Sequence, residues 1–463
     1  MNSLCVISPF DGREVGTVTL SSKQDIDTAL DLARSVYDVQ SKWLAKHQRI
    51  AILEKTVTIM QSRVEELTQI AVNEGGKPYI DSKVEVERAI DGVKLAIEHL
   101  GTMGGKEIPM GQTASSVNRM AYTMKEPLGV VAAISAFNHP LNLAVHQLIP
   151  AIAVGSPVII KPSELTPMSA LNFAEILYEA GLDKAWCQVV ICDRETSEYL
   201  ATHHKIDYLS FIGSAKVGWY LNSKVAAGTL VSLEHGGVAP VIVEADADLD
   251  ALIPALSKGG FYHAGQVCVS VQRVYVHSSI CEEVTARLVE DAHKLKVGDP
   301  LNPTTEIGPL ISHHEVDRVD SWVQEAIAGG ATLLCGGKRE SASCYQPTVL
   351  LNPKSEAKVS QLEVFGPVIC IYSYDELDHA LAAANSLDVS FQAAVFTKDI
   401  DKALYVVKRL NAMTVMVNDH TAFRVDWMPF GGAKMSGLGM GGIPYSMEEM
   451  SKDKLFIIKS NAI

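Results

Sequence analysis

The sequence predicts an α/β protein made of a doubly wound unit, a second α/β unit and a small β element. Its 463 residues are too many for one hydrophobic core, so the chain should divide into domains. Between residues 130 and 234, short runs rich in Val and Ile alternate with helical stretches, and the runs lack strict apolar and polar alternation. Such runs are typical of parallel strands that helices cover on both faces.

The first hundred residues are predicted to be mostly helical. Within the segment 25–43, Asp25 is placed to cap a helix. One face of that helix carries apolar side chains at helical spacing, namely Ile26, Leu30, Ala33 and Val36. A second long helical region is expected to reach about Gly101.

Parallel strands are then expected in the segments 130–137, 157–161, 187–192, 207–213 and 230–234. A second α/β unit begins near Gly237. We therefore expect the first unit to comprise residues 1–108 and 129–235, and the second to comprise residues 236–445.

A third element is expected from residues 109–128 and 446–463. The segment 109–128 is predicted to be a hairpin inserted before the first sheet, and residues 454–460 (KLFIIKS) a terminal strand. An exposed apolar strand tends to recruit a partner edge, which favours self-association. The alternative is a tail that pairs within its own subunit.

Composition and net charge favour a small-molecule substrate over a nucleic acid or a membrane partner. The chain is 47% hydrophobic and 20% charged, as in ordinary globular proteins. Lys and Arg total 40 against 54 Asp and Glu, and the net charge of −14 argues against nucleic acid or anionic membrane as a partner. A small-molecule substrate fits better. The N-terminus lacks a signal-like basic region and no segment has the ~18 apolar residues of a membrane span, so we expect a cytoplasmic protein.

The cysteine and histidine patterns indicate neither disulfides nor a metal. The eight cysteines are scattered without a CxxC pair, which favours free thiols in a reducing compartment. The adjacent pairs His203-His204 and His313-His314 point in divergent directions on a helix or a strand, so we expect no metal site.

Cys268 is the candidate nucleophile, with Asn138 and Glu234 as its partners. A thiolate that attacks a carbonyl needs donors for the oxyanion and later a base for the water that releases the acyl group. Asn138 follows a hydrophobic strand and offers an amide, and Glu234 lies between a strand and two glycines.

With these residues the chain resembles the aldehyde dehydrogenase superfamily. Blocks in the family's order span almost the whole chain, namely FNHPLN (137–142), IIKPSELTP (159–167), FIGSAKVG (211–218), LEHGG (233–237), GQVC (265–268), EVFGPV (363–368) and MPFGGAKMSGLG (428–439). The resemblance implies a Rossmann-like cofactor domain, a catalytic domain that holds Cys268, and a β oligomerisation element that builds a homodimer or homotetramer.

The resemblance also implies NAD(P)-dependent oxidation of an aldehyde to a carboxylic acid. Cys268 would form a thiohemiacetal and then a thioester, Asn138 and the backbone N–H at Cys268 would hold the oxyanion, and Glu234 would activate water. Members that acylate coenzyme A typically lack a base at the position of Glu234, so hydrolysis is favoured. A catalytically silent protein on the same fold is the other alternative, although all three residues are kept.

The cofactor residues follow from the same blocks. Gly213 and Ser214 lie at a strand-to-helix turn suited to a pyrophosphate, although Ser214 could simply cap the helix. In KPSELTP, Lys161, Ser163 and Glu164 resemble the residues around the adenosine ribose. A carboxylate there opposes a 2′-phosphate, which favours NAD and leaves NADP possible.

Glu363 and Phe365 resemble the pair that positions the nicotinamide ribose and ring. For Phe365 the alternative is a packed turn that Pro367 ends. Three departures from the family pattern remain: His235, Val238 and the loop SGLGMGG (436–442), which lacks the usual arginine and glutamate. His235 either shifts the pKa of the neighbouring carboxylate or packs within the turn.

The substrate pocket is expected to be apolar beside the thiol, where Val267 and Val269 flank Cys268. Relatives that act on acidic aldehydes carry an arginine at the helix position that is His146 here. FNHPLN and FRVDWMPFGG (423–432) resemble the lactaldehyde and phosphonoacetaldehyde branch. A small neutral or weakly polar aldehyde is favoured, with His146 and Arg119 as candidates for holding an anionic group.

Overall fold

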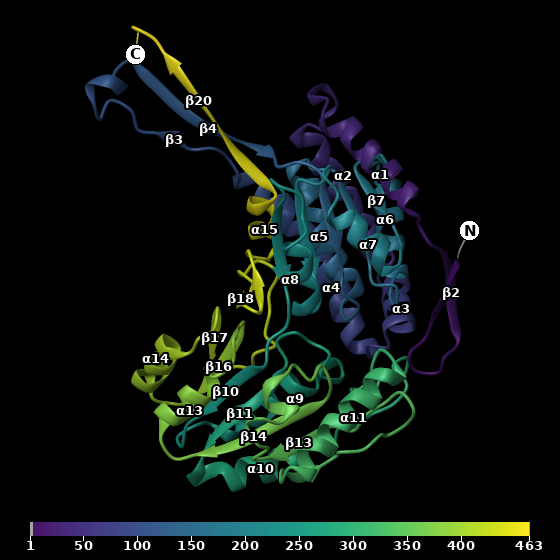
Figure 1. Cartoon of the computed structure of the whole chain (residues 1–463), viewed down its shortest axis with the longest axis vertical. Coiled ribbons are helices and arrows are strands. Elements are labelled where there is room, and N and C mark those ends of the chain that lie inside the picture. Colours follow the sequence, from purple (N-terminus) through teal and green to yellow (C-terminus); the bar gives the residue numbers. More distant parts are fainter. Residues whose placement is uncertain (1–2, 463) are drawn as a thin grey trace.

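The computed structural model describes residues 3–462 and consists of two α/β units and a projecting arm. In Figure 1 the first unit lies above the second, and the arm extends from the upper unit. This arrangement confirms the α/β class that the sequence predicts.

The chain begins with a hairpin that the sequence analysis did not predict. Strands β1 (Ser3–Ile7) and β2 (Glu14–Thr19) pair antiparallel beside the first unit. Helix α1 (Lys23–Tyr37) follows, and its cap is Ser22, not the expected Asp25. Asp25 instead accepts the backbone N–H of Ser22 at 2.7 Å, which completes a capping box.

The second helical region is divided into α2 (Lys46–Ser62), α3 (Val64–Gly75) and α4 (Tyr79–Thr102). A 3₁₀ turn at Gln40–Lys42 precedes them.

The first sheet has the strand order β19-β9-β8-β5-β6-β7. All its expected strands are confirmed, the first four with tighter bounds and the last with the expected bounds: β5 (Val131–Ile134), β6 (Val158–Lys161), β7 (Cys187–Val189), β8 (Tyr208–Ile212) and β9 (Leu230–Glu234). The connecting helices are α5 (Pro140–Val154), α6 (Met168–Glu179), α7 (Arg194–Ala201) and α8 (Ala215–Asn222).

Helices cover both faces of this sheet, as the Val and Ile runs predicted. Along β5, Val131 and Ala133 pack into the cluster that includes α4 and α5, whereas Ala132 and Ile134 pack into the cluster with α1 and α7. Alternate side chains of a strand point to opposite faces, so a strand buried on both faces is apolar at every position.

The second sheet has the strand order β12-β13-β14-β11-β10-β16-β17. Its strands are β10 (Ala239–Val243), β11 (Val271–His277), β12 (Thr332–Cys335), β13 (Thr348–Leu351), β14 (Val368–Tyr374), β16 (Gln392–Phe396) and β17 (Thr414–Val417). The helices of this unit are α9 (Leu249–Phe261), α10 (Ser278–Ala292), α11 (His313–Ala328), α12 (Lys358–Gln361), α13 (Leu377–Ala384) and α14 (Ile400–Arg409).

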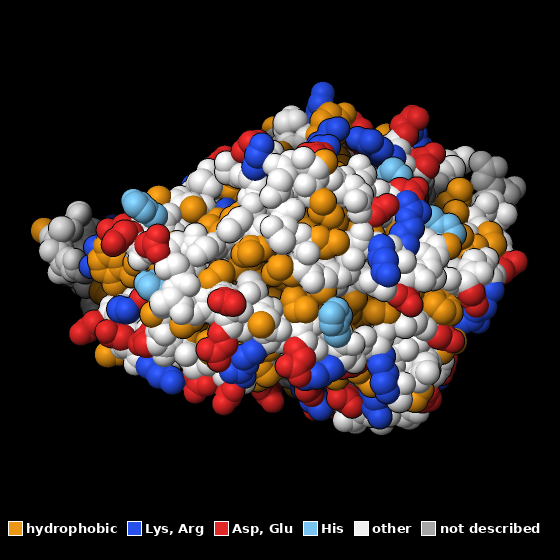
Figure 2. Space-filling view, turned by 90° about the horizontal axis from the view of Figure 1, so that it is seen from below, with side chains coloured by type: hydrophobic (Ala, Val, Ile, Leu, Met, Phe, Trp, Pro, Cys, Tyr) orange, Lys and Arg blue, Asp and Glu red, His pale blue; other side chains and the backbone are white. Residues whose placement is uncertain are grey.

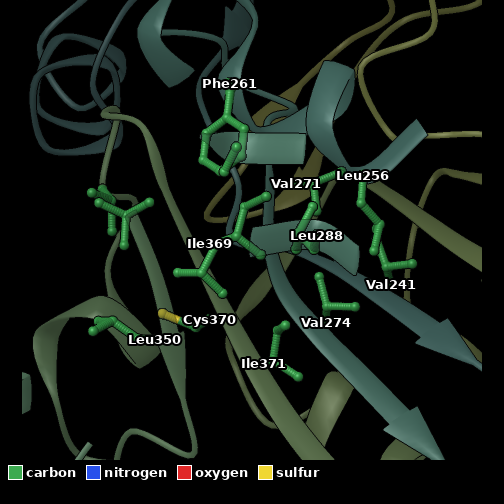
Figure 3. Packing of buried hydrophobic residues seen from close by; sticks show 14 of the residues in the cluster. Val241, Leu256, Phe261, Val271, Val274, Leu288, Leu350, Ile369, Cys370 and Ile371 are labelled. Carbon is green, nitrogen blue, oxygen red and sulfur yellow. The ribbon is translucent and has the colours of Figure 1, made fainter. Parts of the chain in front are cut away.

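Aliphatic side chains from the strands and from α9 and α10 fill the core of the second unit (Figure 3). Phe261 closes this core beside Val271 and Ile369, and all three are almost fully buried. Because Phe261 ends α9 and Val271 begins β11, this packing fixes both ends of the segment that carries Cys268.

The chain then returns to the first unit. After the short pair β15 (Val389–Ser390) and β18 (Ala433–Lys434), strand β19 (Gly437–Leu438) pairs with β9. Helix α15 (Ile443–Glu449) follows, and its Ile443 and Met447 are buried in the core that includes α4 and α5. The expected domain ranges stay a prediction, but this return brings residues 437–449 against the first sheet.

The arm is a sheet in the order β20-β4-β3. β20 (Ser451–Lys459) pairs with β4 (Arg119–Pro127) along its whole length, and β3 (Glu107–Ile108) pairs with Tyr122 and Ala121. The tail therefore pairs within its own chain, and the hairpin expected inside 109–128 is a single strand between two partners. Several apolar side chains of the arm remain exposed, namely Met124, Leu455, Ile457 and Ile458.

Within residues 3–462, no helix combines the length and apolar character that crossing a membrane requires. The same residues contain no group of His, Cys, Asp or Glu placed to hold a metal ion. Figure 2 shows the lower face of the second unit, where acidic and basic side chains are interspersed without a large field of one sign.

Candidate active site

A pocket of about 310 Å³ opens where the strand order of the first sheet reverses, between β5 and β8. Ligands of doubly wound sheets bind at such a point, outside the carboxyl ends of the strands. Here the segment Ala136–Asn138 follows β5, and Gly213 and Ser214 follow β8. The pocket is also lined by Glu234, His235, Gly236, Cys268, Glu315, Arg318, Trp322, Glu363 and Phe365.

Asn138 is positioned by the start of α5. Glu85 accepts the backbone N–H groups of Leu141 and Asn142 at 2.9 and 3.0 Å, so its carboxylate satisfies donors that the first helical turn leaves unpaired. Pro140 occupies the first position of α5, where its missing N–H costs nothing.

Cys268 and Glu363 come from the second unit. Each precedes one of two neighbouring parallel strands, β11 and β14, so both lie at the same edge of the second sheet. The cysteine loop is held in an uncommon backbone conformation, because His263, Ala264 and Gly265 have φ values of 50°, 53° and 71°. A Cβ at Gly265 would collide with the backbone of Gly366, so the two loops touch.

Hydrogen bonds from several elements fix the cysteine loop. Asn138 Nδ2 donates to the carbonyl oxygen of Gln266 at 2.9 Å, and the Gly237 N–H donates to that of Cys268 at 3.0 Å. The Thr421 hydroxyl donates to the carbonyl oxygen of Val269 at 2.6 Å. The nucleophile is therefore held by residues of both units, and Asn138 keeps a second amide hydrogen for another acceptor.

Burial controls the ionisation of the reacting groups. It raises the pKa of the Cys268 thiol to about 12, with a further increase from the charge of Glu363, while the positive charge of Arg424 opposes the rise. Burial also raises the pKa of Glu234, and Arg424 again opposes it. The thiol is therefore protonated at neutral pH in this structure, and a base must remove its proton before attack.

Glu234 ends β9, and its carboxylate lies against Gly441, where a Cβ would collide with Oε1. Gly441 belongs to the loop SGLGMGG, which lacks the usual arginine and glutamate. Glycine at position 441 therefore leaves the space that the Glu234 carboxylate occupies.

Comparison with known proteins agrees with this geometry. The sequence pattern of the aldehyde dehydrogenase family matches residues 2–456. The chain belongs to the aldehyde dehydrogenase family. It is accordingly an NAD(P)-dependent oxidoreductase that acts on aldehydes.

Similar relatives include the 3-sulfolactaldehyde dehydrogenase of Priestia aryabhattai, which is 39% identical over 98% of this chain and 94% of the relative. The lactaldehyde dehydrogenase of Methanocaldococcus jannaschii is 37% identical over 98% of this chain and 96% of the relative. Among solved structures, the glyceraldehyde-3-phosphate dehydrogenase of Methanocaldococcus jannaschii with NADP has a TM-score of 0.94 and 36% identity, and covers 99% of both chains. The predicted family is confirmed, and its similar relatives include lactaldehyde dehydrogenases, as the predicted resemblance to the lactaldehyde and phosphonoacetaldehyde branch suggested.

The pocket of this aldehyde dehydrogenase fits a dinucleotide. Glu363 Oε1 is buried, and among residues 3–462 it has no hydrogen-bond partner, so the pocket offers an acceptor for hydroxyl donors. Burial raises the pKa of Glu363 to about 8, with Arg318 opposing. Gly236 leaves space for this carboxylate, since a Cβ there would collide with it.

The other predicted cofactor residues lie along the same edge of the first sheet. Ser214 caps α8 through its backbone position, and its side chain makes no capping hydrogen bond. Lys161 ends β6, next to β5, with Nζ 4.0 Å from Glu164 Oε1. Ser163 Oγ accepts the N–H of Leu165 at 3.2 Å. Their roles toward the cofactor stay predictions.

Phe365 lies in the pocket with a φ of 46°, and its ring meets that of Phe137 edge to face at 5.7 Å. His235 packs in its turn: Nδ1 donates to the carbonyl oxygen of Met435 at 2.9 Å, and the ring lies edge to face with Trp219. Val238 is buried. These contacts match the alternative in which His235 packs within the turn.

The four predicted substrate residues do not all lie near Cys268. Val267 and Val269 are 8% and 3% exposed and pack beside Cys268 with Phe391 and Phe430. His146 is buried on α5, where Nε2 lies 2.8 Å from Asp426 Oδ1.

Arg119 does not reach the pocket, and this expectation is corrected. It begins β4 on the arm, pairs with Lys459, and donates to the carbonyl oxygen of Val117 at 3.3 Å.

Sequence reasoning missed two arginines. Arg318 on α11 donates to the carbonyl oxygen of Val364 at 2.7 Å, stacks on Trp322 at 4.6 Å, and supports the loop of Glu363. Arg424 lies close enough to Cys268 and Glu234 to oppose the rise in the pKa of both. Arg424 lies in the block FRVDWMPFGG (423–432). The block indicated a resemblance to one branch of the family, but not that Arg424 lies near Cys268 and Glu234.

Proposed function

We propose that this enzyme oxidises a small aldehyde to a carboxylate through a thioester on Cys268 that water hydrolyses. The observation that carries the proposal is that Cys268, Asn138 and Glu234 line one pocket, although they lie far apart in the sequence. This set supplies a nucleophile, an oxyanion donor and a base.

The first half of the cycle forms a covalent adduct. Cys268 loses its proton to Glu234 or to water, and its sulfur bonds to the aldehyde carbon. The carbonyl oxygen becomes an oxyanion, which accepts the second amide hydrogen of Asn138 and the backbone N–H of Cys268. NAD(P), when bound, supplies the hydride acceptor. Lys161, Ser163, Glu164, Ser214, Glu363 and Phe365 would hold it beside Cys268.

The second half releases the acid. Glu234 takes a proton from water, the water oxygen bonds to the thioester carbon, and the carbon–sulfur bond breaks to restore Cys268. The raised pKa of Glu234 favours this role, because a base works best when its pKa lies near the operating pH. Its presence favours water over coenzyme A as acceptor.

The proposed substrate is a short aldehyde. Two similar relatives are named for lactaldehyde and 3-sulfolactaldehyde, which share a three-carbon 2-hydroxyaldehyde skeleton and differ by a sulfonate. Val267 and Val269 leave an apolar wall beside the thiol, which suits a compact chain.

We also propose that the enzyme prefers NAD, forms a homodimer or homotetramer, and is located in the cytoplasm. The Glu164 carboxylate favours NAD over NADP by repelling a 2′-phosphate, whereas Lys161 tolerates one. The exposed apolar side chains of the arm favour a homodimer or homotetramer. Free thiols on all eight cysteines suit the cytoplasm.

The test is reduced-cofactor production with lactaldehyde and 3-sulfolactaldehyde, each with NAD and with NADP, in the presence and absence of coenzyme A. The expected products are the free acids, with NAD preferred and no effect of coenzyme A. Acyl-coenzyme A as product would replace hydrolysis by thiol transfer, and a folded enzyme that oxidises no short aldehyde would contradict the proposal.

A further inference from the structure

Arg424 is a buried cation that uses little of its hydrogen-bonding capacity. Its side chain is 12% exposed, and its guanidinium carbon lies 3.6 Å from the ring centre of Phe430. Nη2 lies 3.3 Å from His146 Nδ1. Nε is buried and has no hydrogen-bond partner within the described part of the chain. Buried charged donors are normally paired, so this one calls for a ligand.

The nearby carboxylate of Asp426 is already occupied. Arg88 donates to both of its oxygens, at 3.1 and 2.7 Å. His146 Nε2 lies 2.8 Å from Oδ1, whereas Arg424 Nε is 3.8 Å from the same oxygen. Since the Arg424 guanidinium can only donate, His146 Nδ1 accepts, and the proton of a neutral His146 lies on Nε2 and points to Asp426.

The cluster therefore holds two guanidinium charges against one carboxylate. The charges of Glu234 and of the Cys268 thiol also act on Arg424, but within residues 3–462 Arg424 and Glu234 form no ion pair. Glu234 must also remain available to activate water. A buried excess of positive charge with an unused donor is best satisfied by an anion.

The position of Arg424 links this anion to the substrate. Phe430, on which it stacks, packs in the same apolar cluster as Val267 and Val269, on either side of Cys268. The guanidinium thus packs against the apolar cluster beside Cys268, and its positive charge reaches the thiol. An aldehyde bonded to Cys268 would therefore have this cation in its neighbourhood.

We propose that Arg424 binds an anionic group of the substrate, so that the enzyme prefers a short aldehyde with a carboxylate, sulfonate or phosphate at its far end. Asp426, held by Arg88 and His146, is the positioning residue that sets the Arg424 side chain without neutralising it. The inference rests on the proposed aldehyde oxidation and adds its substrate class. It replaces Arg119, the arginine that the sequence suggested, with Arg424.

The test compares aldehydes that differ only in the anionic group: 3-sulfolactaldehyde with lactaldehyde, and succinate semialdehyde with butanal. The wild-type enzyme should favour the anionic member of each pair by about 10-fold or more in kcat/KM. Arg424→Gln should lower kcat/KM for the anionic member about 10- to 100-fold more than for the neutral member, whose smaller loss reflects the effect of the Arg424 charge on the Cys268 thiol. Arg424→Lys, which keeps the charge without the fork of donors, should give an intermediate loss for the anionic members.

Two controls separate binding of the anion from other roles of Arg424. The neutral ester 4-nitrophenyl acetate reports the reactivity of Cys268. Because Arg424 opposes the rise in the pKa of this thiol, ester hydrolysis in Arg424→Gln should fall by the same modest factor as oxidation of the neutral aldehydes, and by much less than oxidation of the anionic ones. Arg287→Gln, which removes an arginine that pairs with Asp250 on the surface, should leave both pairs unchanged. In the wild type, succinate should compete with lactaldehyde, whereas neutral succinamide should not.

Equal loss for both members of a pair, together with lost esterase activity, would assign Arg424 to the thiol and overturn the inference. Equal wild-type kcat/KM within each pair, or equal inhibition by succinate and succinamide, would overturn it without any variant. If a folded wild-type enzyme oxidised none of the four aldehydes, the proposed oxidation itself would fail.

Discussion

Burial opposes the ionisation of three acidic groups in the pocket. Cys268, Glu234 and Glu363 all have a raised pKa, and the positive charges that oppose the rise come from Arg424 and Arg318. A ligand that brings a hydrogen-bond donor or a positive charge to such a group favours its ionised form and lowers its pKa.

Replacing the nucleophile should separate chemistry from binding. Cys268→Ala should lower dehydrogenase activity roughly 10⁴-fold or more, because the covalent adduct cannot form. Nucleotide binding, measured by titration calorimetry, should stay within about 2-fold, since the predicted contacts lie on Lys161, Glu164, Ser214 and Glu363. Substantial turnover in this variant would mean that another group attacks the aldehyde.

The affinity for NAD should depend on pH through Glu363. Its pKa is about 8 without nucleotide, and hydroxyl donors of the ribose would stabilise the ionised form and lower the pKa. Binding therefore releases a proton, and the affinity should rise by up to about 10-fold per pH unit from pH 6 to about 8 and then level off. Calorimetry on the wild type and on Glu363→Gln would show it, since the variant should lose the dependence. A flat wild-type profile would place the ribose elsewhere.

The sequence identified the reacting residues but not the charges around them. Cys268, Glu234 and Asn138 each stand in a local block that carries its own signal. Arg424 was missed because its role depends on its contacts with His146 and Asp426. His146 lies far from Arg424 in the sequence, so no local pattern reveals that contact. Arg119 was wrongly expected near the substrate because the sequence pattern does not show that β4 belongs to the projecting arm.

At the level of helices and strands, the strand ends bring the site together. β5 and β8 deliver Asn138 and Ser214 to the point where the first sheet reverses, and β11 and β14 begin beside Cys268 and Glu363. Strands buried on both faces were predictable because every position is apolar. The β1–β2 hairpin was not, because its exposed residues carry a weaker pattern.

The turn after β9 should be sensitive to one methyl group. In Gly236→Ala the new Cβ would displace the Glu363 carboxylate, which belongs to a flexible side chain and can move without unfolding. Affinity for NAD should fall about 10-fold, the value of one lost charge-assisted hydrogen bond. The melting temperature should change by no more than a few degrees. Unchanged affinity would show that Glu363 does not need this position.

The arm is the part of the whole molecule with the most exposed apolar side chains for its size. Ile457 and Ile458 are 53% and 48% exposed on its two faces, and neighbouring strand residues point in opposite directions. The sequence predicted the terminal strand, and the structure adds that the strand is already paired with β4. The proposed association would therefore use the faces or the free edge of the arm sheet.

A charge on the arm should dissociate the assembly. Ile457→Glu and Ile458→Glu each place a carboxylate on one face, and at least one should lower the mass measured by light scattering. Leu404→Glu, at an equally exposed apolar position on α14, is the matched control and should leave the mass unchanged. A wild-type monomer, or wild-type mass in both arm variants, would rule out assembly through these faces.

Both units contribute to the proposed chemistry, in which Cys268 from the second carries an acyl group that Glu234 from the first helps to hydrolyse. In Glu234→Gln, attack and hydride transfer do not need the hydrolytic water, and solvent can take the proton of Cys268, so rapid mixing with NAD and a good aldehyde should give a burst of about one NADH per subunit. Very slow turnover should follow, and mass spectrometry should find the acyl group on Cys268. Turnover at the wild-type rate, with no burst and no adduct, would contradict the account.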